Sequence, residues 1–201
     1  VIHFAAFSLV GESMSVPEQY FRNNCMAGLT LVDTMVKYGV PYLIFSSTAA
    51  TYGEPEYTPI DEEHPKHPTN AYGESKLIVE RMLRWNDHAH GLKYVALRYF
   101  NVAGALSDGS IGEDHSPETH LIPLVLATAL GQREKLSLFG TDYPTRDGTC
   151  VRDYIHVEDL IDAHLLALEY LKAGQPSTAF NLGNGQGFTN REIIEAARRV
   201  T

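Results

Sequence analysis

Apolar residues in the first half of the chain follow two alternating periods. Short apolar runs at 1–6, 42–47 and 94–99, rich in β-branched and aromatic residues, predict buried strands. Between the first two runs, residues 17–38 carry apolar side chains at steps of three and four, which predicts an amphipathic helix. A second helix is predicted from about 71 to 88. Strands alternating with helices predict an α/β fold with parallel strands and helical crossovers.

The second half of the chain is less regular. Residues 101–119 are rich in Gly, Ser and Asp and show no periodicity, and loops this long inside a compact domain are usually functional. Further elements are predicted as helices at 122–131 and 157–171 and strands at 136–139 and 179–182. Thr189, followed three residues later by Glu192, predicts a capping box that opens a last helix.

Composition narrows the class of protein. The chain has 201 residues and 44% hydrophobic content, enough for a sizeable core, and its net charge of −9 argues against nucleic-acid or anionic-membrane surfaces. It has no apolar stretch of about eighteen residues, so no membrane-spanning helix is expected. Cys25 and Cys150 suit neither a metal site nor a disulfide framework, which favours reduced thiols in the cytoplasm, with Cys25 buried.

Tyr72 and Lys76 form the most informative pair. They stand four residues apart in the helix predicted at 71–88, so they share one face. An ammonium beside a phenol favours the phenolate, which would let Tyr72 act as a general acid and base near neutral pH. The alternative for an isolated pair is a partly exposed tyrosine beside a solvated lysine.

Hydroxyl side chains follow the strand predicted at 42–47. Ser46, Ser47 and Thr48 replace the apolar run abruptly. Ligands of parallel α/β sheets bind outside the carboxyl ends of the strands, so Thr48 stands where a substrate would lie. The alternative is a Ser/Thr turn that caps the strand end.

These residues, with other blocks in the same order, resemble the extended short-chain dehydrogenase/reductases, and within them the enzymes that epimerise nucleotide sugars at C4. The blocks span essentially the whole chain: Val1-Ile-His-Phe-Ala-Ala6, Ser46-Ser-Thr48, Ala71-Tyr-Gly-Glu-Ser-Lys76, Arg98-Tyr-Phe-Asn101 and Val151-Arg-Asp-Tyr-Ile-His156. The resemblance implies a Rossmann-like doubly wound parallel sheet, incomplete here, with a smaller α/β substrate-binding domain. It assigns 1–101 to the NAD-binding domain and 102–201 mainly to the substrate domain, with segments between about 151 and 182 returning to the Rossmann sheet.

The resemblance also implies a reaction. Enzymes of this kind interconvert UDP-glucose and UDP-galactose in galactose metabolism, by reversible oxidation at C4 through a 4-keto sugar with tightly bound NAD. Tyr72 would be the base in both directions, Lys76 would lower its pKa and bind the nicotinamide ribose, and Thr48 would relay the proton. UDP-N-acetylglucosamine remains an alternative substrate.

Binding residues follow from the same resemblance. The implied NAD contacts are Phe4, Ala5, Ala6, Asn24, Ser46, Tyr72, Lys76, Tyr99 and Val102. The implied UDP-hexose contacts are Thr48, Tyr72, Asn101, His120, Leu121, Ser137, Phe139 and Arg152. From the pattern alone, Asn101 is also typical of a turn, Phe139 of a core position, and Arg152 of an ion pair with Asp153 or Asp159.

Other readings compete with the epimerase. A sugar-nucleotide 4,6-dehydratase shares the Tyr/Lys pair but needs an acid and a base after the Thr, where this chain has Ala49-Ala50. A relative that binds a dinucleotide without turnover is disfavoured by the intact Thr48, Tyr72 and Lys76. No metal site is expected, because no second ligand has convincing spacing from His120.

The chain departs from the family in one respect. Such enzymes begin with a G-x-x-G-x-x-G turn that holds the NAD pyrophosphate, and this chain lacks it; the glycines at 183–187 have the wrong spacing and lie late. We therefore expect a fragment that has little activity by itself. Analogy predicts a homodimer of the longer enzyme through the helices at 17–38 and 71–88.

Overall fold

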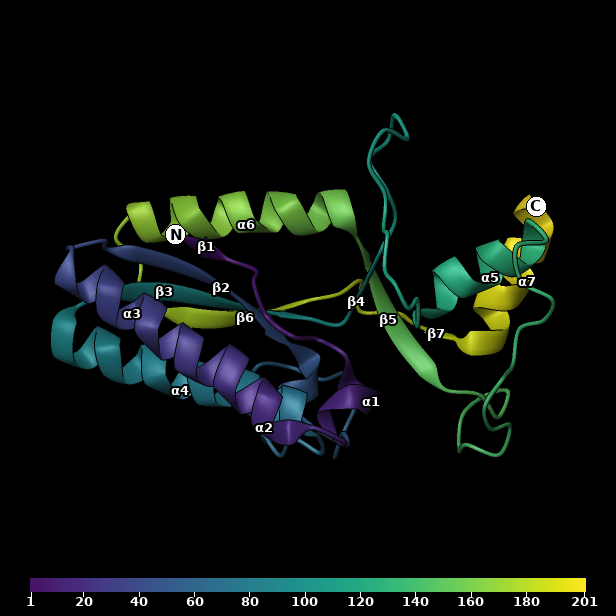
Figure 1. Cartoon of the computed structure of the whole chain (residues 1–201), viewed down its shortest axis with the longest axis horizontal. Coiled ribbons are helices and arrows are strands. Elements are labelled where there is room, and N and C mark those ends of the chain that lie inside the picture. The colour runs from purple at the N-terminus through teal and green to yellow at the C-terminus, as the bar shows by residue number, and fades with distance from the viewer. The chain divides into compact units, whose positions relative to one another are not determined.

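A computed structural model describes residues 1–201, and its first half is built around a parallel sheet (Figure 1). All four strands run parallel in the order β1-β2-β3-β6, with bounds Ile2–His3, Tyr42–Thr48, Lys93–Tyr99 and Thr178–Leu182. The first strand is shorter than predicted, because it pairs with β2 only at Ile2 and His3. The α/β fold with a parallel sheet is confirmed.

Helices cover both faces of this sheet because successive strand residues point to opposite sides. On one face, Leu43 and Phe45 of β2 and Ala96 of β3 join a core with α3 (Ala27–Lys37) and α4 (Ala71–His90). On the other face, a second core is formed with α6 (Val157–Lys172); its strand members are Ile44, Val95 and Leu97. Because both faces of β2 and β3 are packed, the carboxyl ends of these strands are held in place.

The long helical segments agree with their predicted extents. The first runs as α2 (Pro17–Tyr20), a π-helical stretch (Phe21–Met26) and α3. Asn70 caps α4 by accepting a hydrogen bond from the Gly73 N–H, and Gly91 ends the helix in the left-handed conformation. A short helix α1 (Val10–Ser13) was not predicted. No helix of the structure combines the length and the apolarity needed to cross a membrane.

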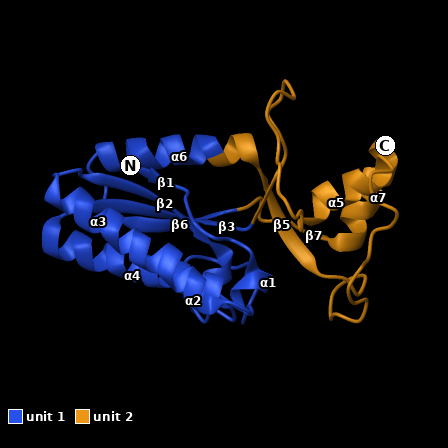
Figure 2. Cartoon of the chain, viewed as in Figure 1, with its two compact units in different colours: residues 1–100, 161–182 blue, residues 101–160, 183–201 orange.

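The chain divides into two compact units (Figure 2). Unit 1 comprises residues 1–100 and 161–182, and unit 2 comprises 101–160 and 183–201. Unit 2 has a three-stranded sheet and two helices in contact: β4 (Asn101–Ala103), β5 (Val151–His156), β7 (Gly187–Thr189), α5 (Leu121–Ala129) and α7 (Asn190–Val200). The segment that returns to the parallel sheet begins later than predicted, because β5 pairs with β4 and β7 in unit 2.

Two sequence predictions for unit 2 have opposite outcomes. The capping box is confirmed, since Thr189 Oγ1 accepts from the Glu192 N–H and the Glu192 carboxylate accepts from the Thr189 N–H. The strand predicted at 136–139 is wrong, because β5 already has a partner on each side and no sheet edge receives this run. Phe139 is 83% exposed, so its interpretation as a core residue is also wrong.

Candidate functional site

Thr48 and Tyr72 are brought together at the carboxyl end of β2. Thr48 is the last residue of β2 and is 8% exposed. Its Oγ1 accepts the Ala50 N–H at 3.1 Å and so caps the 3-10 turn Ala49–Thr51. The Thr48 side chain also lies close enough to Tyr72, in the first turn of α4, to lower the pKa of its phenol. The alternative interpretation of Thr48 as a cap is therefore confirmed, and its contact with a substrate stays a prediction.

Lys76 lies one turn further along α4 and is buried, with 3% of its surface exposed. Its Nζ donates to the Ser46 carbonyl oxygen at 2.8 Å and lies 5.0 Å from the centre of the Phe45 ring. The alternative of a solvated lysine is therefore wrong. Burial lowers the pKa of Lys76 to about 8, because an ammonium loses its hydration there without a carboxylate partner.

The pKa of Tyr72 moves in the direction opposite to the expected one. Burial of the phenol raises its pKa, and the nearby Thr48 side chain opposes that shift. Lys76 does not depress it in this structure, because the Lys76 ammonium is directed at the Ser46 carbonyl and lies 5.9 Å from the Tyr72 ring centre. The neutral phenol is the form that the protein alone favours at neutral pH.

The residues after β1 form an accessible edge next to this site. Phe4 is 50% exposed and packs on the His164 ring at 4.7 Å, while Ala5 and Ala6 leave the strand end free of large side chains. Tyr99, at the end of β3, has its hydroxyl 2.6 Å from His164 Nε2, and burial raises the pKa of Tyr99. The side chains predicted to line a cofactor in unit 1 thus gather at the strand ends.

Asn24 has a structural use that the sequence did not show. Its Oδ1 accepts from the Phe7 N–H at 2.9 Å, and its Nδ2 donates to the Phe7 carbonyl and to Ser75 Oγ. The side chain is 5% exposed, so these bonds hold the segment after β1 against α4. Asn24 shapes the edge of the site by fixing its backbone.

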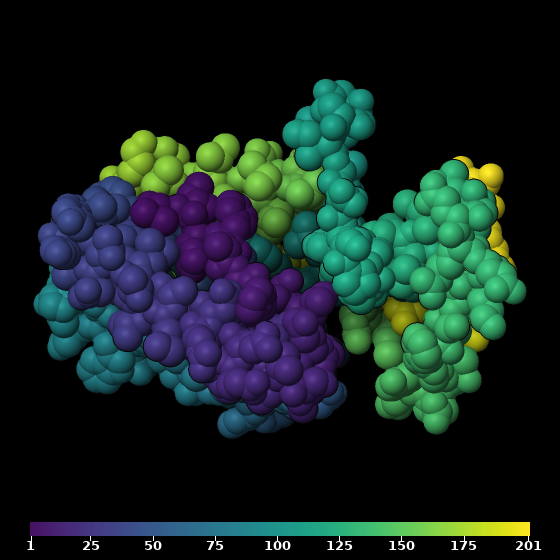
Figure 3. Space-filling view, in the orientation of Figure 1, coloured from purple at the N-terminus to yellow at the C-terminus, as the bar shows by residue number.

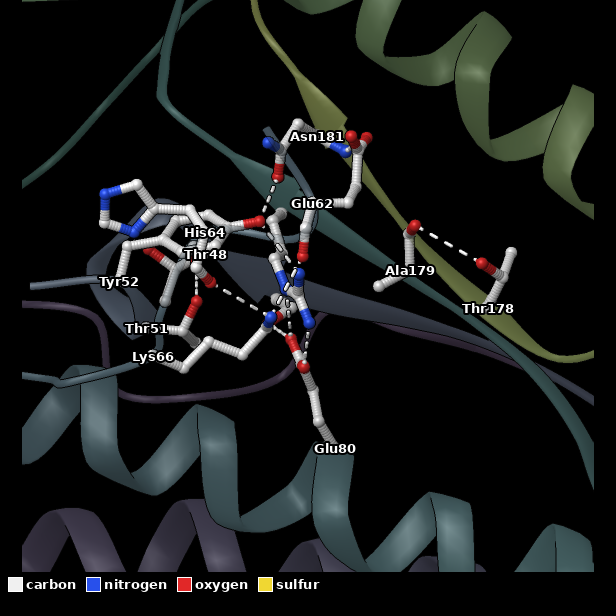
Figure 4. Close-up of polar contacts among 12 residues, drawn as sticks. Thr48, Thr51, Tyr52, Glu62, His64, Lys66, Glu80, Thr178, Ala179 and Asn181 are labelled. Atoms are coloured by element: carbon white, nitrogen blue, oxygen red, sulfur yellow. Dashed lines mark hydrogen bonds and ion pairs between the residues drawn. The ribbon is translucent and has the colours of Figure 1, made fainter. Parts of the chain in front are cut away.

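A buried ion pair supports the same strand ends, and sequence reasoning missed it. Arg98 of β3 donates two hydrogen bonds to the Glu80 carboxylate, at 3.0 and 2.6 Å, and a third to the Tyr52 hydroxyl at 2.8 Å. Ser47, the residue before Thr48, donates to the same carboxylate. Figure 4 shows Glu80 rising from α4 toward this cluster. The sequence did contain a signal for this pair: Glu80 interrupts the apolar positions of the helix predicted at 71–88, and Arg98 interrupts the apolar strand predicted at 94–99.

The same cluster continues into the loop before α4. The Tyr52 hydroxyl donates to Asn181 Oδ1 at 2.7 Å, and the Asn181 N–H donates to Glu62 Oε1 at 2.8 Å (Figure 4). Lys66 Nζ donates to the Glu62 carbonyl at 2.9 Å and lies 5.6 Å from the Tyr52 ring centre. These bonds tie the loop before α4 to β6, which keeps the rim of the site in place.

In unit 2, Asn101, Val102 and Arg152 lie on paired strands. Asn101 Nδ2 donates to the Asp153 carbonyl at 2.9 Å, and Val102 pairs with Ile155. Arg152 is exposed, donates to the Val151 carbonyl and forms no ion pair with Asp153 or Asp159. The interpretation of Arg152 as half of an ion pair is therefore wrong.

The Asp153 carboxylate accepts hydrogen bonds from the glycine-containing turn at 183–187. It accepts the Asn184 N–H at 2.8 Å and the Gly185 N–H at 2.9 Å. A Cβ on Gly183 would lie 2.6 Å from Asp153 Oδ2, so a side chain at 183 would displace the carboxylate from these amides. These amides hold a carboxylate of the protein itself.

The remaining predicted contacts of unit 2 are not gathered into one cluster. His120 stands at the N-cap position of α5 without a side-chain capping hydrogen bond, and Leu121 is the first residue of the helix, whereas Ser137 and Phe139 are exposed on a segment without strand or helix. Around His120 the structure differs from the sequence expectation. Atoms of Glu113, His115 and Glu118 lie close to its ring, so His120 has neighbours of metal-ligand type.

The geometry at the end of β2 agrees with what comparison of whole sequences shows. The profile of the "NAD dependent epimerase/dehydratase family" matches residues 1–183. The chain belongs to this family. A UDP-glucose 4-epimerase of Streptococcus mutans is 62% identical over 201 residues, all of this chain and 60% of that protein.

Solved structures give the same family relationship. A UDP-glucose 4-epimerase from Brucella ovis in complex with NAD has a TM-score of 0.96 and 50% identity, covering 98% of this chain and 61% of that one. A UDP-Glc/GlcNAc 4-epimerase from Campylobacter jejuni has a TM-score of 0.83 and 48% identity, covering 99% and 60%. The chain thus spans about three fifths of the length of these relatives.

Proposed function

We propose that this chain is part of a UDP-glucose 4-epimerase that interconverts UDP-glucose and UDP-galactose. The observation that carries the proposal is the assembly of Thr48, Tyr72 and Lys76 at the carboxyl end of β2. Relatives with that name are up to 62% identical over the chain, which supports the same reaction here. Ala49 and Ala50, which follow Thr48, carry no group able to transfer a proton, and this disfavours a dehydratase.

The residues of unit 1 fit NAD as the cofactor. The carboxyl ends of parallel strands are where dinucleotides bind, and here they carry the small side chains Ala5, Ala6 and Ser46 beside the half-exposed Phe4 ring. Lys76 supplies an ammonium at the same place. When bound, NAD would supply reversible hydride transfer at C4, which passes through a 4-keto sugar.

The roles of the protein groups follow from their contacts. Tyr72 would take the proton of the sugar hydroxyl and return it, because its phenol faces Thr48 at the strand end. Thr48 would hold the reacting oxygen through its hydroxyl. Since burial raises the pKa of Tyr72 and Lys76 does not lower it in this structure, the phenolate would need the Lys76 ammonium to move closer to the phenol.

Unit 2 would bind the nucleotide part of the substrate. The exposed guanidinium of Arg152, free of carboxylate partners, suits a diphosphate, and Asn101 would assist it. Uracil contacts are assigned by resemblance to His120, Leu121, Ser137 and Phe139. The longer enzyme would form a homodimer through the helical segment 17–37 and α4.

A chimera tests this function with the residues of this chain. Residues 1–201 would replace the matching segment of the Streptococcus mutans enzyme, and the product would be incubated with UDP-galactose and with UDP-N-acetylgalactosamine. We expect UDP-glucose to form, and Tyr72→Phe in the chimera to keep bound NAD but to lower turnover by about 100-fold or more. A chimera whose turnover is unchanged by Tyr72→Phe would refute the role of Tyr72.

The second substrate distinguishes the alternative function. The Campylobacter jejuni relative is named for both UDP-Glc and UDP-GlcNAc, so a UDP-N-acetylglucosamine 4-epimerase remains the competing proposal. Turnover of UDP-N-acetylgalactosamine by the chimera at a rate comparable to that of UDP-galactose would support it. Turnover of UDP-galactose alone would support the first proposal.

A further inference from the structure

Four potential metal ligands converge on the loop between β4 and α5. Glu113, His115, Glu118 and His120 each direct one ligand atom to the same point, and all four atoms lie within 4.8 Å of one another. The loop stands at the surface, as the space-filling view shows (Figure 3), and residues 104–120 contain no helix or strand. Two hydrogen bonds hold part of the group together, one between His115 Nδ1 and Glu113 Oε1 and one between His120 Nδ1 and Glu118 Oε1.

The spacing of the ligand atoms matches a four-coordinate metal ion. His115 Nδ1 lies 3.0 Å from Glu113 Oε1 and 3.7 Å from Glu118 Oε2. His120 Nδ1 lies 3.0 Å from Glu113 Oε1 and 2.8 Å from Glu118 Oε1. Bonds of about 2.1 Å in a tetrahedral site place neighbouring ligand atoms about 3.4 Å apart. The four separations, of which one is measured to the second oxygen of Glu118, run from 2.8 to 3.7 Å and so lie near that value.

Hydrogen bonds account for only part of this arrangement, because the His115–Glu118 and His120–Glu113 contacts are not among them. The Nδ1 of His120 can carry a single proton, yet it faces carboxylate oxygens of both Glu113 and Glu118. Two carboxylates are also held near each other on an exposed loop of a chain with net charge −9. Exposed ion pairs stabilise such clusters by about 1 kcal/mol or less. A cation at the centre would satisfy both carboxylates and both imidazoles together.

One of the carboxylates is already oriented for binding. Glu118 Oε1 accepts the N–H groups of Thr119 and His120, at 2.6 and 2.7 Å, which fixes the direction of its carboxylate. Preoriented ligands lower the entropic cost of binding a metal. The centres of the His115 and His120 rings lie 5.0 Å apart, so both rings can coordinate one ion.

We infer that Glu113, His115, Glu118 and His120 form a binding site for a divalent transition metal of the Zn²⁺ type. Two imidazole nitrogens with two carboxylate oxygens suit such an ion better than Mg²⁺ or Ca²⁺, which take oxygen ligands. The ion would order the loop directly before α5, since His120 is the N-cap of that helix. The inference does not depend on the reaction at the end of β2, but His120, assigned above to uracil by resemblance, would bind the metal instead.

Cobalt is the probe for this site. The 201-residue chain, stripped of metal by a chelator, would be titrated with Co²⁺ and followed by visible absorption. We expect one ion per chain with the intense bands of tetrahedral Co²⁺, and displacement of these bands by Zn²⁺. His115→Gln and, separately, Glu113→Gln should weaken binding by about tenfold or more, because loss even of a supporting neighbour has that effect.

A matched control uses histidines outside the cluster. His88 and His90 are exposed on α4, so the double variant His88→Gln/His90→Gln should bind Co²⁺ as the unmodified chain does. Far-UV circular dichroism checks that each variant is folded. An unmodified chain without tetrahedral bands, or binding equally strong in the cluster variants and the control, would show that the four side chains form an ion-pair cluster only.

Discussion

Gly73 lies against the backbone of Ala50. A Cβ placed on Gly73 would be 2.4 Å from the Ala50 carbonyl oxygen and 2.9 Å from its carbonyl carbon, closer than real Cβ atoms approach. This contact joins the first turn of α4 to the 3-10 turn that follows β2. Because Tyr72 precedes Gly73 and Thr48 caps that turn, the missing side chain at 73 sets how closely the phenol and the hydroxyl approach.

Gly73→Ala should therefore disturb the protein at this contact. We expect the free energy of unfolding to fall by about 2 kcal/mol, because the added methyl group must push two backbone segments apart. The matched control is Gly11→Ala, since Gly11 is also helical and a Cβ there meets no atom within 4 Å. Urea unfolding of both variants measures the difference. Equal stability of the two would show that the segments separate without cost.

The Arg98–Glu80 pair gives a larger expected effect. Arg98→Met leaves the Glu80 carboxylate in the core, with the Ser47 hydroxyl still donating but no cation beside it. We expect a loss of about 3 kcal/mol or more, since an unpaired buried charge costs that much. The double variant Arg98→Met/Glu80→Met should recover part of the loss, because it removes the stranded charge.

An exposed pair on the same helix is the control for this prediction. Arg81 and Glu74 lie 3.7 Å apart with side chains 56% and 36% exposed. Arg81→Met should change the free energy of unfolding by about 0.5 kcal/mol or less. Chemical denaturation of all three variants under one condition compares them. If Arg98→Met were no more harmful than Arg81→Met, the buried pair would contribute no stability.

The sequence could predict the Tyr72–Lys76–Thr48 arrangement because local periods determine it. A 3.6-residue period places Tyr72 and Lys76 on one face, and parallel strands end at one edge of the sheet. Burial could not be predicted in the same way. The desolvation that raises the pKa of Tyr72 and lowers that of Lys76 comes from packing between segments distant in sequence; the Phe45 ring, for example, lies 5.0 Å from Lys76 Nζ.

In unit 2, irregular segments limit how much of the structure can be predicted from the sequence. The run at 136–139 has the apolar alternation of a strand, yet strand formation depends on a free sheet edge elsewhere in the chain. The convergence of His115 on His120 likewise depends on how a loop without periodicity folds back. The capping box at Thr189 was predictable because its two residues contact each other within one helical turn.

The turn around Asp153 allows a test of the late glycine segment. Asp153→Asn replaces one acceptor oxygen by an amide that cannot accept the Gly185 or Asn184 N–H. We expect the free energy of unfolding to fall by about 2 kcal/mol, since a backbone donor loses its partner. Asp162→Asn, at an exposed position of α6, is the control and should be close to neutral. Equal effects would mean that the turn holds without Asp153.

Lys76 should give the protein an unusual dependence of stability on pH. The folded-state pKa of about 8 lies below the ordinary value of 10.5, so between these limits the unfolded chain binds the proton and the folded chain does not. Stability contributed by this group therefore rises as pH increases from about 8 toward 10. Cys25 acts in the opposite direction above pH 9, because burial raises its pKa to about 11.

Comparison of variants separates these two effects. Lys76→Met removes the titrating amine but keeps the apolar stem, so the unmodified chain should gain about 2 kcal/mol relative to this variant between pH 8 and pH 10. Lys135→Met, at an exposed position, should show no such gain. Urea unfolding at pH 7, 8, 9 and 10 measures all three. Parallel stability curves for the unmodified chain and Lys76→Met would mean that the buried amine keeps its ordinary pKa, and that the Lys76 ammonium is far better solvated than its 3% exposure indicates.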